Sequence, residues 1–151
     1  MYRCRWFVLC ENVIHDGRSN NLSMINALSV VRAPIFPAFH VRFSFAAMLD
    51  REGESEGPLS LRFVRENDDG DEILFNAKGT NDSPSVVQFF LNFPMGIRLF
   101  KEGKVTFRIE ALEGDSSWYA VGSQSLQVEV LKQAPELPSH DAEEPTEKET
   151  S

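Results

Sequence analysis

One stretch in the middle of the chain alternates between apolar and mostly polar or small residues at every second position. The apolar positions are Phe39, Val41, Phe43, Phe45, Ala47 and Leu49. A period of two matches a β-strand, whose side chains point alternately to opposite faces, and does not match a helix, whose period is 3.6 residues. We therefore predict one strand over residues 39–49, with three phenylalanine rings on the core face and with Arg42 and Ser44 on the other.

The rest of the chain repeats this pattern in short segments separated by turn-forming residues. The predicted strands cover residues 5–13, 22–31, 39–49, 59–66, 73–77, 87–93, 105–111 and 118–131. Leu22, Ile25 and Leu28 also fit a helical spacing, which leaves a helix open there, although Ala33 precedes a proline and favours extended backbone. Eight short strands predict an all-β chain folded as an antiparallel Greek-key β-sandwich.

The length and the aromatic content bear on the number of domains and on the core. A chain of 151 residues is long enough for one domain with a core of its own. The chain has 12 Phe against 2 Tyr and 2 Trp. Phenylalanine rings need no polar partner when they are buried, so we expect a core rich in phenylalanine.

The negative charge is concentrated at the C-terminus. Residues 133–151 hold six acidic residues and one basic residue, so they carry −5 of the net −8 and leave −3 for residues 1–132. Leu137 is the one large apolar residue of this tail, which therefore buries too little surface to offset its ordering entropy. We predict a folded domain over 1–132 and a disordered acidic tail over 133–151. The body shows no basic stripe, so a nucleic-acid partner is not expected.

The cysteines and the N-terminus bear on the compartment. Cys4 and Cys10 lie six residues apart on one predicted strand, roughly 20 Å from each other, which is too far for a disulfide. Neither a signal peptide nor an apolar run long enough to span a membrane is evident. We expect free thiols, no membrane span and a cytoplasmic location.

Four segments carry a resemblance to a known family. They are Phe7-Val-Leu-Cys-Glu-Asn-Val13, Leu22-Ser-Met-Ile-Asn-Ala-Leu28, Phe36-Pro37 and Glu102-Gly-Lys-Val-Thr-Phe-Arg-Ile109. Over residues 5–131 the chain resembles a family of small uncharacterised bacterial proteins. The resemblance implies a sandwich of immunoglobulin- or C2-like type and no assigned activity.

The residue types that carry catalysis are sparse and scattered. His15 and Asp16 lie in a predicted turn, His40 lies on the face opposite the phenylalanines, and Cys10 fits an apolar strand as a small core residue. None of the sequence motifs of nucleophilic hydrolases, zinc proteases or phosphate-binding loops is present. We predict a protein without enzymatic activity or cofactor, and we keep open an enzyme or ligand-binding sandwich that carries no recognisable motif.

Acidic loops offer an alternative function. If the strands simply alternate up and down, the loops at 14–21, 50–58, 79–85 and 113–117 share one end of the sandwich. That end would carry Asp16, Asp50, Glu52, Glu54, Glu56, Asp82, Glu113 and Asp115. Because calcium binds six to eight oxygen ligands, a C2-like calcium site is the alternative, with Asp16, Asp50, Asp82 and Asp115 as its candidate ligands.

The connection over residues 93–102 suggests a surface for a partner. Pro94 interrupts the preceding strand, and the residues that follow are unusually apolar for a loop. Because neighbouring residues of an extended segment point to opposite sides, one of Leu99 and Phe100 should be buried. We predict a partner surface formed by Met95, Ile97 and Phe100, and hence a protein-interaction or structural module that binds another protein or a second copy of itself.

Overall fold

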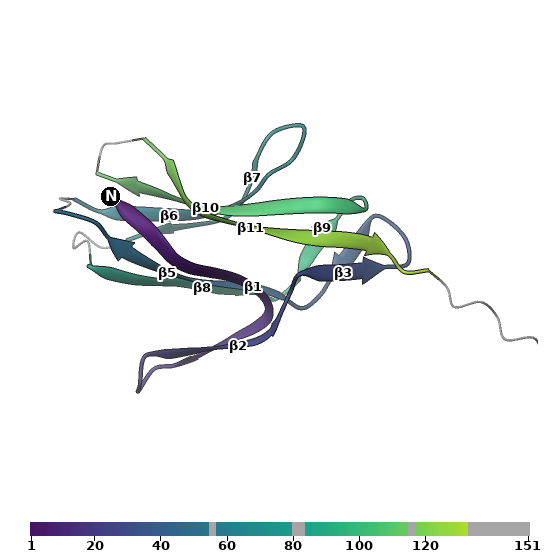
Figure 1. Ribbon diagram of the computed structural model, residues 1–151, viewed down its shortest axis with the longest axis horizontal. Coiled ribbons are helices and arrows are strands. Elements are labelled where there is room, and N and C mark those ends of the chain that lie inside the picture. Colours follow the sequence, from purple (N-terminus) through teal and green to yellow (C-terminus); the bar gives the residue numbers. More distant parts are fainter. Residues whose placement is uncertain (55–56, 80–83, 115–116, 133–151) are drawn as a thin grey trace, which may run out of the picture.

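Eleven β-strands build the part of the chain that the computed structural model describes, namely residues 1–54, 57–79, 84–114 and 117–132 (Figure 1). In chain order they are β1 (Tyr2–Asp16), β2 (Asn21–Ala27), β3 (Val30–Ala33), β4 (Ala38–His40), β5 (Phe43–Arg51), β6 (Leu59–Arg65), β7 (Glu72–Lys78), β8 (Val86–Phe93), β9 (Ile97–Leu99), β10 (Gly103–Glu113) and β11 (Tyr119–Val130).

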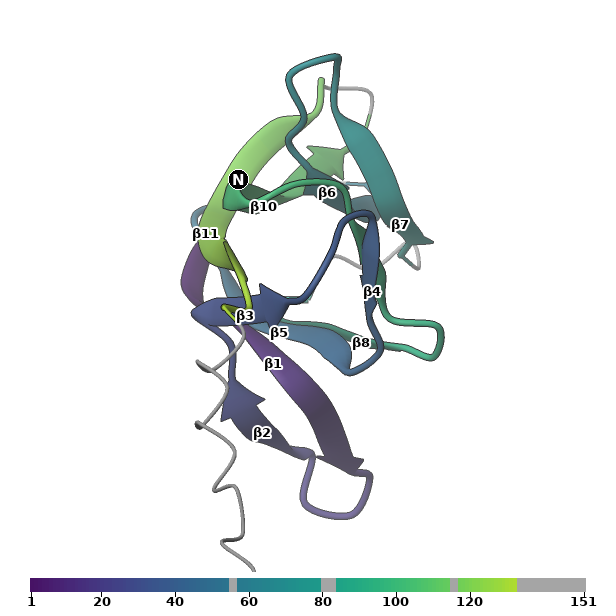
Figure 2. The same ribbon diagram turned by 90° about the vertical axis from the view of Figure 1, so that its right-hand side faces the viewer.

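The strands form three sheets. One has the order β2-β1-β5-β8, the second has the order β3-β11-β10-β6-β7, and β4 and β9 form a small third sheet. All neighbours pair antiparallel except β3 and β11, whose pairing is parallel. The five-stranded sheet is therefore mixed, and it curls into a half-barrel (Figure 2).

The all-β prediction is confirmed, but its finer form is not. A purely antiparallel arrangement is wrong, because β3 lies parallel to β11. The count of about eight strands is too low, because two predicted strands are each divided and β9 was counted as a connection. The immunoglobulin- or C2-like subtype stays a prediction.

The predicted strand over 22–31 is divided between two sheets. β2 pairs with β1 as far as Ala27, and the next amide, that of Leu28, donates to the carbonyl oxygen of Leu9 at 2.7 Å. The chain then crosses to the other sheet, where Val30 pairs with Gln127 of β11. The helix that the spacing left open over this stretch does not form.

The predicted strand over 39–49 is also divided, at Val41 and Arg42. Phe43 and Phe45 of β5 are fully buried, as predicted. Phe39, by contrast, is 66% exposed and Val41 is 68% exposed. The prediction that Phe39 shares one face with Phe43 and Phe45 is wrong, because β4 pairs with β9 in the small third sheet and turns Phe39 to solvent.

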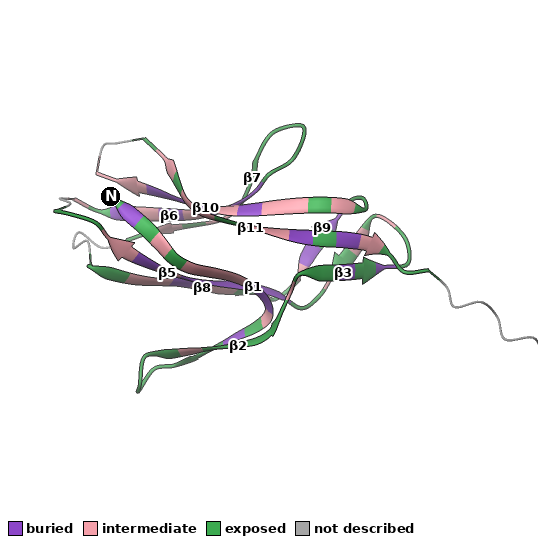
Figure 3. Cartoon of the chain, viewed as in Figure 1, coloured by how far each residue is buried: buried purple, intermediate pink, exposed green. Residues whose placement is uncertain are grey.

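Stacked phenylalanine rings fill the space between the two large sheets. Phe45 and Phe63 stack with their ring centroids 4.1 Å apart, and Phe63 stacks on Phe107 at 5.5 Å. These three rings and Phe43 are almost completely shielded from solvent, and Figure 3 shows buried positions along the facing strands. The phenylalanine-rich core is confirmed.

A second, smaller core lies on the outer face of the four-stranded sheet. Its buried members are Cys10, Val13 and Ala46. The far half of β1 crosses this face, where the Asn92 side chain accepts from the Val13 amide at 2.7 Å and donates to the Val13 carbonyl at 2.8 Å. The same half of β1 also buries Ser44, which we predicted to lie on the face opposite the phenylalanines.

The structure bears on the two cysteines and on the expected absence of a membrane span. Cys4 and Cys10 are both free. Burial raises the pKa of each thiol above its usual 9.0, so both resist ionisation. Within the described residues, no helix combines the length and the apolar character that crossing a membrane requires.

Candidate functional site

A cluster of exposed apolar side chains lies on the outer side of the small third sheet. Phe39 of β4 lies opposite Arg98 of β9. Val41 follows β4 directly and packs beside Gly96, and Phe100 lies one residue beyond β9, where the Arg98 guanidinium approaches its ring at 5.3 Å. We call this set the β4–β9 surface, with Met95 of the preceding turn as its fifth member; Met95 is 79% exposed and Phe100 is 54% exposed.

Two of the three residues predicted for the partner surface are exposed, and whether they contact a partner stays a prediction. Met95 and Phe100 are exposed, but Ile97 is only 4% exposed and belongs to the main core. Ile97 is buried because it pairs with His40, which directs its side chain inward on the side opposite Arg98. Leu99 is buried beside it, so the prediction that one of Leu99 and Phe100 faces inward is confirmed.

A tight turn joins β8 to β9 and holds the small sheet in place. The Gly96 amide donates to the Phe93 carbonyl at 3.0 Å, and Gly96 has a φ of +66°. A β-carbon at this position would lie 2.0 Å from the carbonyl oxygen of His40 and 2.6 Å from the Cα of Val41. Only glycine allows the turn to pack this closely against β4.

An arginine beneath the surface supports Phe100. Arg65 of β6 is buried, and its Nη1 donates to the Arg98 carbonyl at 2.5 Å. Its guanidinium carbon lies 4.9 Å from the centre of the Phe100 ring, and Arg98 approaches the same ring at 5.3 Å. Phe100 is thus held by two cation–π contacts while half of its surface stays open to solvent.

Two arginines of this region, Arg42 and Arg98, are exposed. Arg98 lies within the β4–β9 surface, and Arg42 follows Val41 directly. Among the residues that the structure describes, neither of the two guanidinium groups forms an ion pair. The surface therefore combines exposed aromatic rings with cationic groups free to meet a carboxylate.

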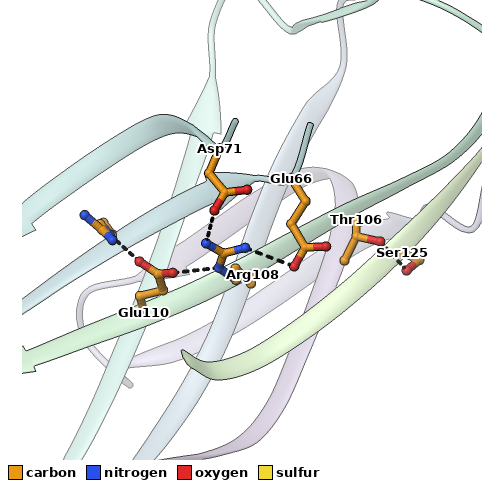
Figure 4. Close-up of polar contacts among 7 residues, drawn as sticks. Glu66, Asp71, Thr106, Arg108, Glu110 and Ser125 are labelled. Atoms are coloured by element: carbon orange, nitrogen blue, oxygen red, sulfur yellow. Dashed lines mark hydrogen bonds and ion pairs between the residues drawn. The ribbon is translucent and has the colours of Figure 1, made fainter. Parts of the chain in front are cut away.

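A second polar feature lies on the outer face of the five-stranded sheet and centres on Arg108 (Figure 4). Its Nε donates to Glu110 at 2.6 Å, its Nη1 to Glu66 at 3.1 Å, and its Nη2 to Asp71. Glu110 also accepts from Arg62, whose guanidinium lies 4.3 Å from the Trp118 ring centre. Strands β6 and β10 carry most of this network, in side chains that alternate away from the core.

The Arg108 network borders an open hollow of about 500 Å³. The hollow is lined by Glu66, Asn67, Asp68, Asp71, Lys104, Thr106 and Arg108. Its carboxylates are occupied by cations: Arg108 binds Glu66 and Asp71, and Lys101 binds Asp68 at 2.8 Å. Groups that already satisfy each other have little left to offer a ligand, so we assign this network to stability.

The four candidate calcium ligands do not share one end of the fold. β1 runs antiparallel to β5, which places Arg3 opposite Asp50, whereas Asp16 at the other end of β1 lies opposite Asn21. The assumption of strict up-and-down alternation fails because the chain leaves the four-stranded sheet between β2 and β5. Asp82 and Asp115 lie outside the described residues, so the site itself stays a prediction.

The described candidates of that set have local roles. Asp50 accepts two bonds from Arg5, both at 2.8 Å. Asp16 accepts from the Ser19 hydroxyl at 2.6 Å and from the Arg18 amide at 2.9 Å; these bonds, that of Ser19 above all, lower the Asp16 pKa and close the β1–β2 turn. In residues 1–54, 57–79, 84–114 and 117–132, no group of three or more His, Cys, Asp and Glu side chains is arranged to hold a metal ion.

The two histidines that the sequence singled out, His15 in a turn and His40 opposite the phenylalanines, have different surroundings. His15 contacts the Phe90 ring at 5.3 Å, and its Nε2 lies 3.0 Å from Oδ1 of Asn20. His40 is half-buried, and burial lowers its pKa below the usual 6.5. Its buried Nε2 has no hydrogen-bond partner among the residues that the structure describes.

Comparison with known proteins places the chain in a family. A family model described as "Family of unknown function (DUF6941)" matches residues 5–133. The chain belongs to this family. A search of curated proteins gave no match. The DUF6941 match contains all of β2 to β11, so the β4–β9 surface and the Arg108 network both lie within the family region.

Acid should weaken this DUF6941 domain through Glu110. Burial alone would raise the Glu110 pKa, but its bonds to Arg108 and Arg62 outweigh burial and hold the pKa below the usual 4.5. A carboxyl whose pKa is lower in the folded chain than in the unfolded chain stabilises the fold at pH values above its unfolded pKa of about 4.3. That stabilisation is lost as the pH falls through the folded pKa. We expect Glu110→Gln to lower the free energy of unfolding by roughly 1–3 kcal/mol at pH 7 and by progressively less towards pH ~3.

Urea unfolding of the wild type and of the variant across this pH range measures the effect. Glu102→Gln is the matched control, since Glu102 is exposed and forms no ion pair among the described residues. That control should track the wild type at every pH. A difference between Glu110→Gln and wild type that is the same at pH ~7 and at pH ~3 would contradict the assignment.

Sequence reasoning missed two parts of the DUF6941 surface. Phe39 and Val41 were assigned to the core, because their alternation continues without a break into that of Phe43. The Arg108 network was missed because its members come from separate segments, and the one available signal was that Arg108 and Glu110 alternate with buried Phe107 and Ile109.

Proposed function

We propose that the chain is a non-catalytic protein-interaction module whose contact region is the β4–β9 surface. The observation that carries the proposal is that Phe39 of β4 and the residues flanking the small sheet, Val41, Met95 and Phe100, are all largely exposed. Exposed apolar clusters rimmed by charge tend to mark interaction sites in soluble proteins. A bacterial origin, a cytoplasmic location and a protein partner rather than a nucleic acid belong to the same proposal.

The composition of the surface suits binding between proteins. Aromatic residues, Met and Arg are enriched where proteins contact each other. Phe39 and Phe100 supply the aromatic rings, Met95 supplies a flexible thioether, and Arg98 lies between them on β9. In such interfaces a few anchors of this kind carry most of the binding energy.

The architecture beneath the surface supports the same proposal. Phe100 rests on Arg65, which is buried and also binds the Arg98 backbone. The turn at Gly96 packs so closely against β4 that a β-carbon at this position would lie 2.0 Å from the His40 carbonyl oxygen. A rigid support lowers the entropy cost of ordering the side chains when a partner binds.

A paired substitution tests the proposal. We expect Phe39→Ser with Phe100→Ser to abolish the specific contact of the chain, whether with a second copy or with another protein. Sedimentation equilibrium of the purified chain measures binding of a second copy, and quantitative affinity capture from host lysate measures binding of another protein. Because both side chains are exposed, the double variant should keep the cooperative unfolding transition of the wild type.

The control removes equivalent apolar groups elsewhere. Ile14 and Met24 are half-exposed on the β1–β2 hairpin, so Ile14→Ser with Met24→Ser changes surface polarity to a similar extent. This control should retain the oligomeric state and the captured proteins of the wild type. If the hairpin control loses the oligomeric state and the captured proteins while the Phe39 and Phe100 variant retains them, the contact lies on the hairpin instead.

A further inference from the structure

We propose that the β4–β9 surface binds the acidic C-terminal tail of the same chain, residues 133–151, when no other partner occupies it. This inference rests on the proposed function, because it takes the β4–β9 surface to be a protein-binding surface. It adds the identity of one occupant and a form of regulation. Three observations support it: the place where the tail begins, the charges on both sides, and the apolar residue that the tail carries.

The tail begins close to the surface. β11 ends at Val130 beside β3, and the Leu131 amide donates to the Ala33 carbonyl at 2.8 Å (Figure 1). Phe39 lies six residues after Ala33 in the chain, so Ala33 and Phe39 are at most about 20 Å apart. A tail that starts at residue 133 can therefore reach the β4–β9 surface within its first few residues.

The charges of the two parts are complementary. Arg42 and Arg98 form no ion pair among the described residues, and both are exposed. The tail offers six carboxylates against one lysine. Arginine binds carboxylates through two parallel hydrogen bonds, which gives geometric specificity in addition to attraction. The acidic side chains of the tail are Glu136, Asp141, Glu143, Glu144, Glu147 and Glu149.

The apolar groups also match. Leu137 is the one large apolar residue of the tail, and it lies between Glu136 and Pro138. Its distance from Lys132 is five residues, or roughly 17 Å in extended backbone, which is comparable to the span from Ala33 to Phe39. Leu137 can thus contact Phe39 or Val41 while Glu136 approaches a guanidinium group.

Tethering makes even a weak contact effective. A segment joined to its site by a short connection has an effective concentration on the order of 1 mM. A site with a dissociation constant of about 1 mM would therefore be occupied about half of the time. A partner must displace the tail in order to bind. Added salt, which screens the charges of the tail contact, would therefore raise the apparent affinity of the surface for the partner.

A spin label on the tail tests this in the full chain. We propose Ala142→Cys, labelled with a nitroxide, and amide spectra of the full chain with the label oxidised and reduced. The same chain without Ala142→Cys, taken through the same reaction, reports any background label on Cys4. We expect the oxidised label to cause loss of amide intensity at Phe39, Val41, Arg98 and Phe100, and high salt to restore it.

Charge variants complete the test. Arg42→Gln with Arg98→Gln should restore the intensity at Phe39 and Phe100. The matched control, Arg18→Gln with Lys78→Gln, removes two exposed cationic groups that form no ion pair among the described residues, and it should restore nothing. Intensity loss that is absent from the β4–β9 surface, or that persists in the Arg42 and Arg98 variant, would overturn the tail proposal.

The outcomes separate the two proposals. If the spin label leaves the β4–β9 surface unaffected while Phe39→Ser with Phe100→Ser still abolishes partner binding, the tail inference is wrong and the proposed function stands. If the label acts on the surface while that double variant keeps every partner, the tail inference holds and the proposed function is wrong.

Discussion

Phe63→Ala is expected to lower the free energy of unfolding by about 3–5 kcal/mol. Phe63 stacks on Phe45 and on Phe107 and is fully buried between the two large sheets. Its removal takes ring contacts from both neighbours and leaves a cavity that the surrounding strands can close only in part. Urea unfolding at neutral pH measures the change directly.

Phe39→Ala is the matched control for that substitution. The chemical change is the same, but Phe39 is mostly exposed, so we expect a cost within about 0.5 kcal/mol. A large cost at Phe39 would mean that residues 39–49 form one strand facing one core, as the alternation alone predicted. Similar costs at the two positions would therefore contradict the division between β4 and β5.

Gly96→Ala is expected to cost roughly 2–5 kcal/mol and to disrupt the β4–β9 surface. About 1–2 kcal/mol comes from the left-handed backbone, since Gly96 has a φ of +66°. About 1–3 kcal/mol more comes from overpacking, because the new β-carbon would lie 2.0 Å from the His40 carbonyl oxygen. β4 and β9 must then separate, so binding through the surface should weaken together with stability.

Gly53→Ala isolates the backbone contribution. Gly53 has a φ of +78°, close to that of Gly96, but a β-carbon there meets nothing within 4 Å. We expect this control to cost only about 1–2 kcal/mol and to leave partner binding unchanged. Equal costs for the two substitutions, measured by urea unfolding, would show that the turn at Gly96 does not press against β4.

Local patterns predicted which residues are buried better than which sheets they join. The alternation placed Phe43, Phe45, Phe63 and Phe107 in the core correctly, because burial on one face repeats every second residue. The same alternation could not show that the strand breaks after His40, since period alone does not reveal a strand's partner. β4 pairs with β9, far along the chain, and that pairing decides the exposure of Phe39 and the burial of Ile97.

The candidate surface was found in part for the same reason. Pro94 and the apolar residues after it indicated a connection that exposes side chains, which is correct for Met95 and Phe100. The contribution of Phe39 and Val41 depends on a long-range pairing that no local signal carries. The Arg108 network is similar, because Glu66 and Asp71 meet Arg108 only once β6 and β10 are aligned.

The central claim is that Phe39 lies at the centre of a protein-contact surface, and site-specific photocrosslinking tests it most directly. A benzoylphenylalanine at position 39 of the full chain, irradiated in host cells, is expected to give a discrete adduct with a partner or with a second copy. The same group at position 14, on the half-exposed hairpin, is expected to give none. An adduct at position 14 with none at position 39, or no adduct at position 39 at all, would contradict the claim.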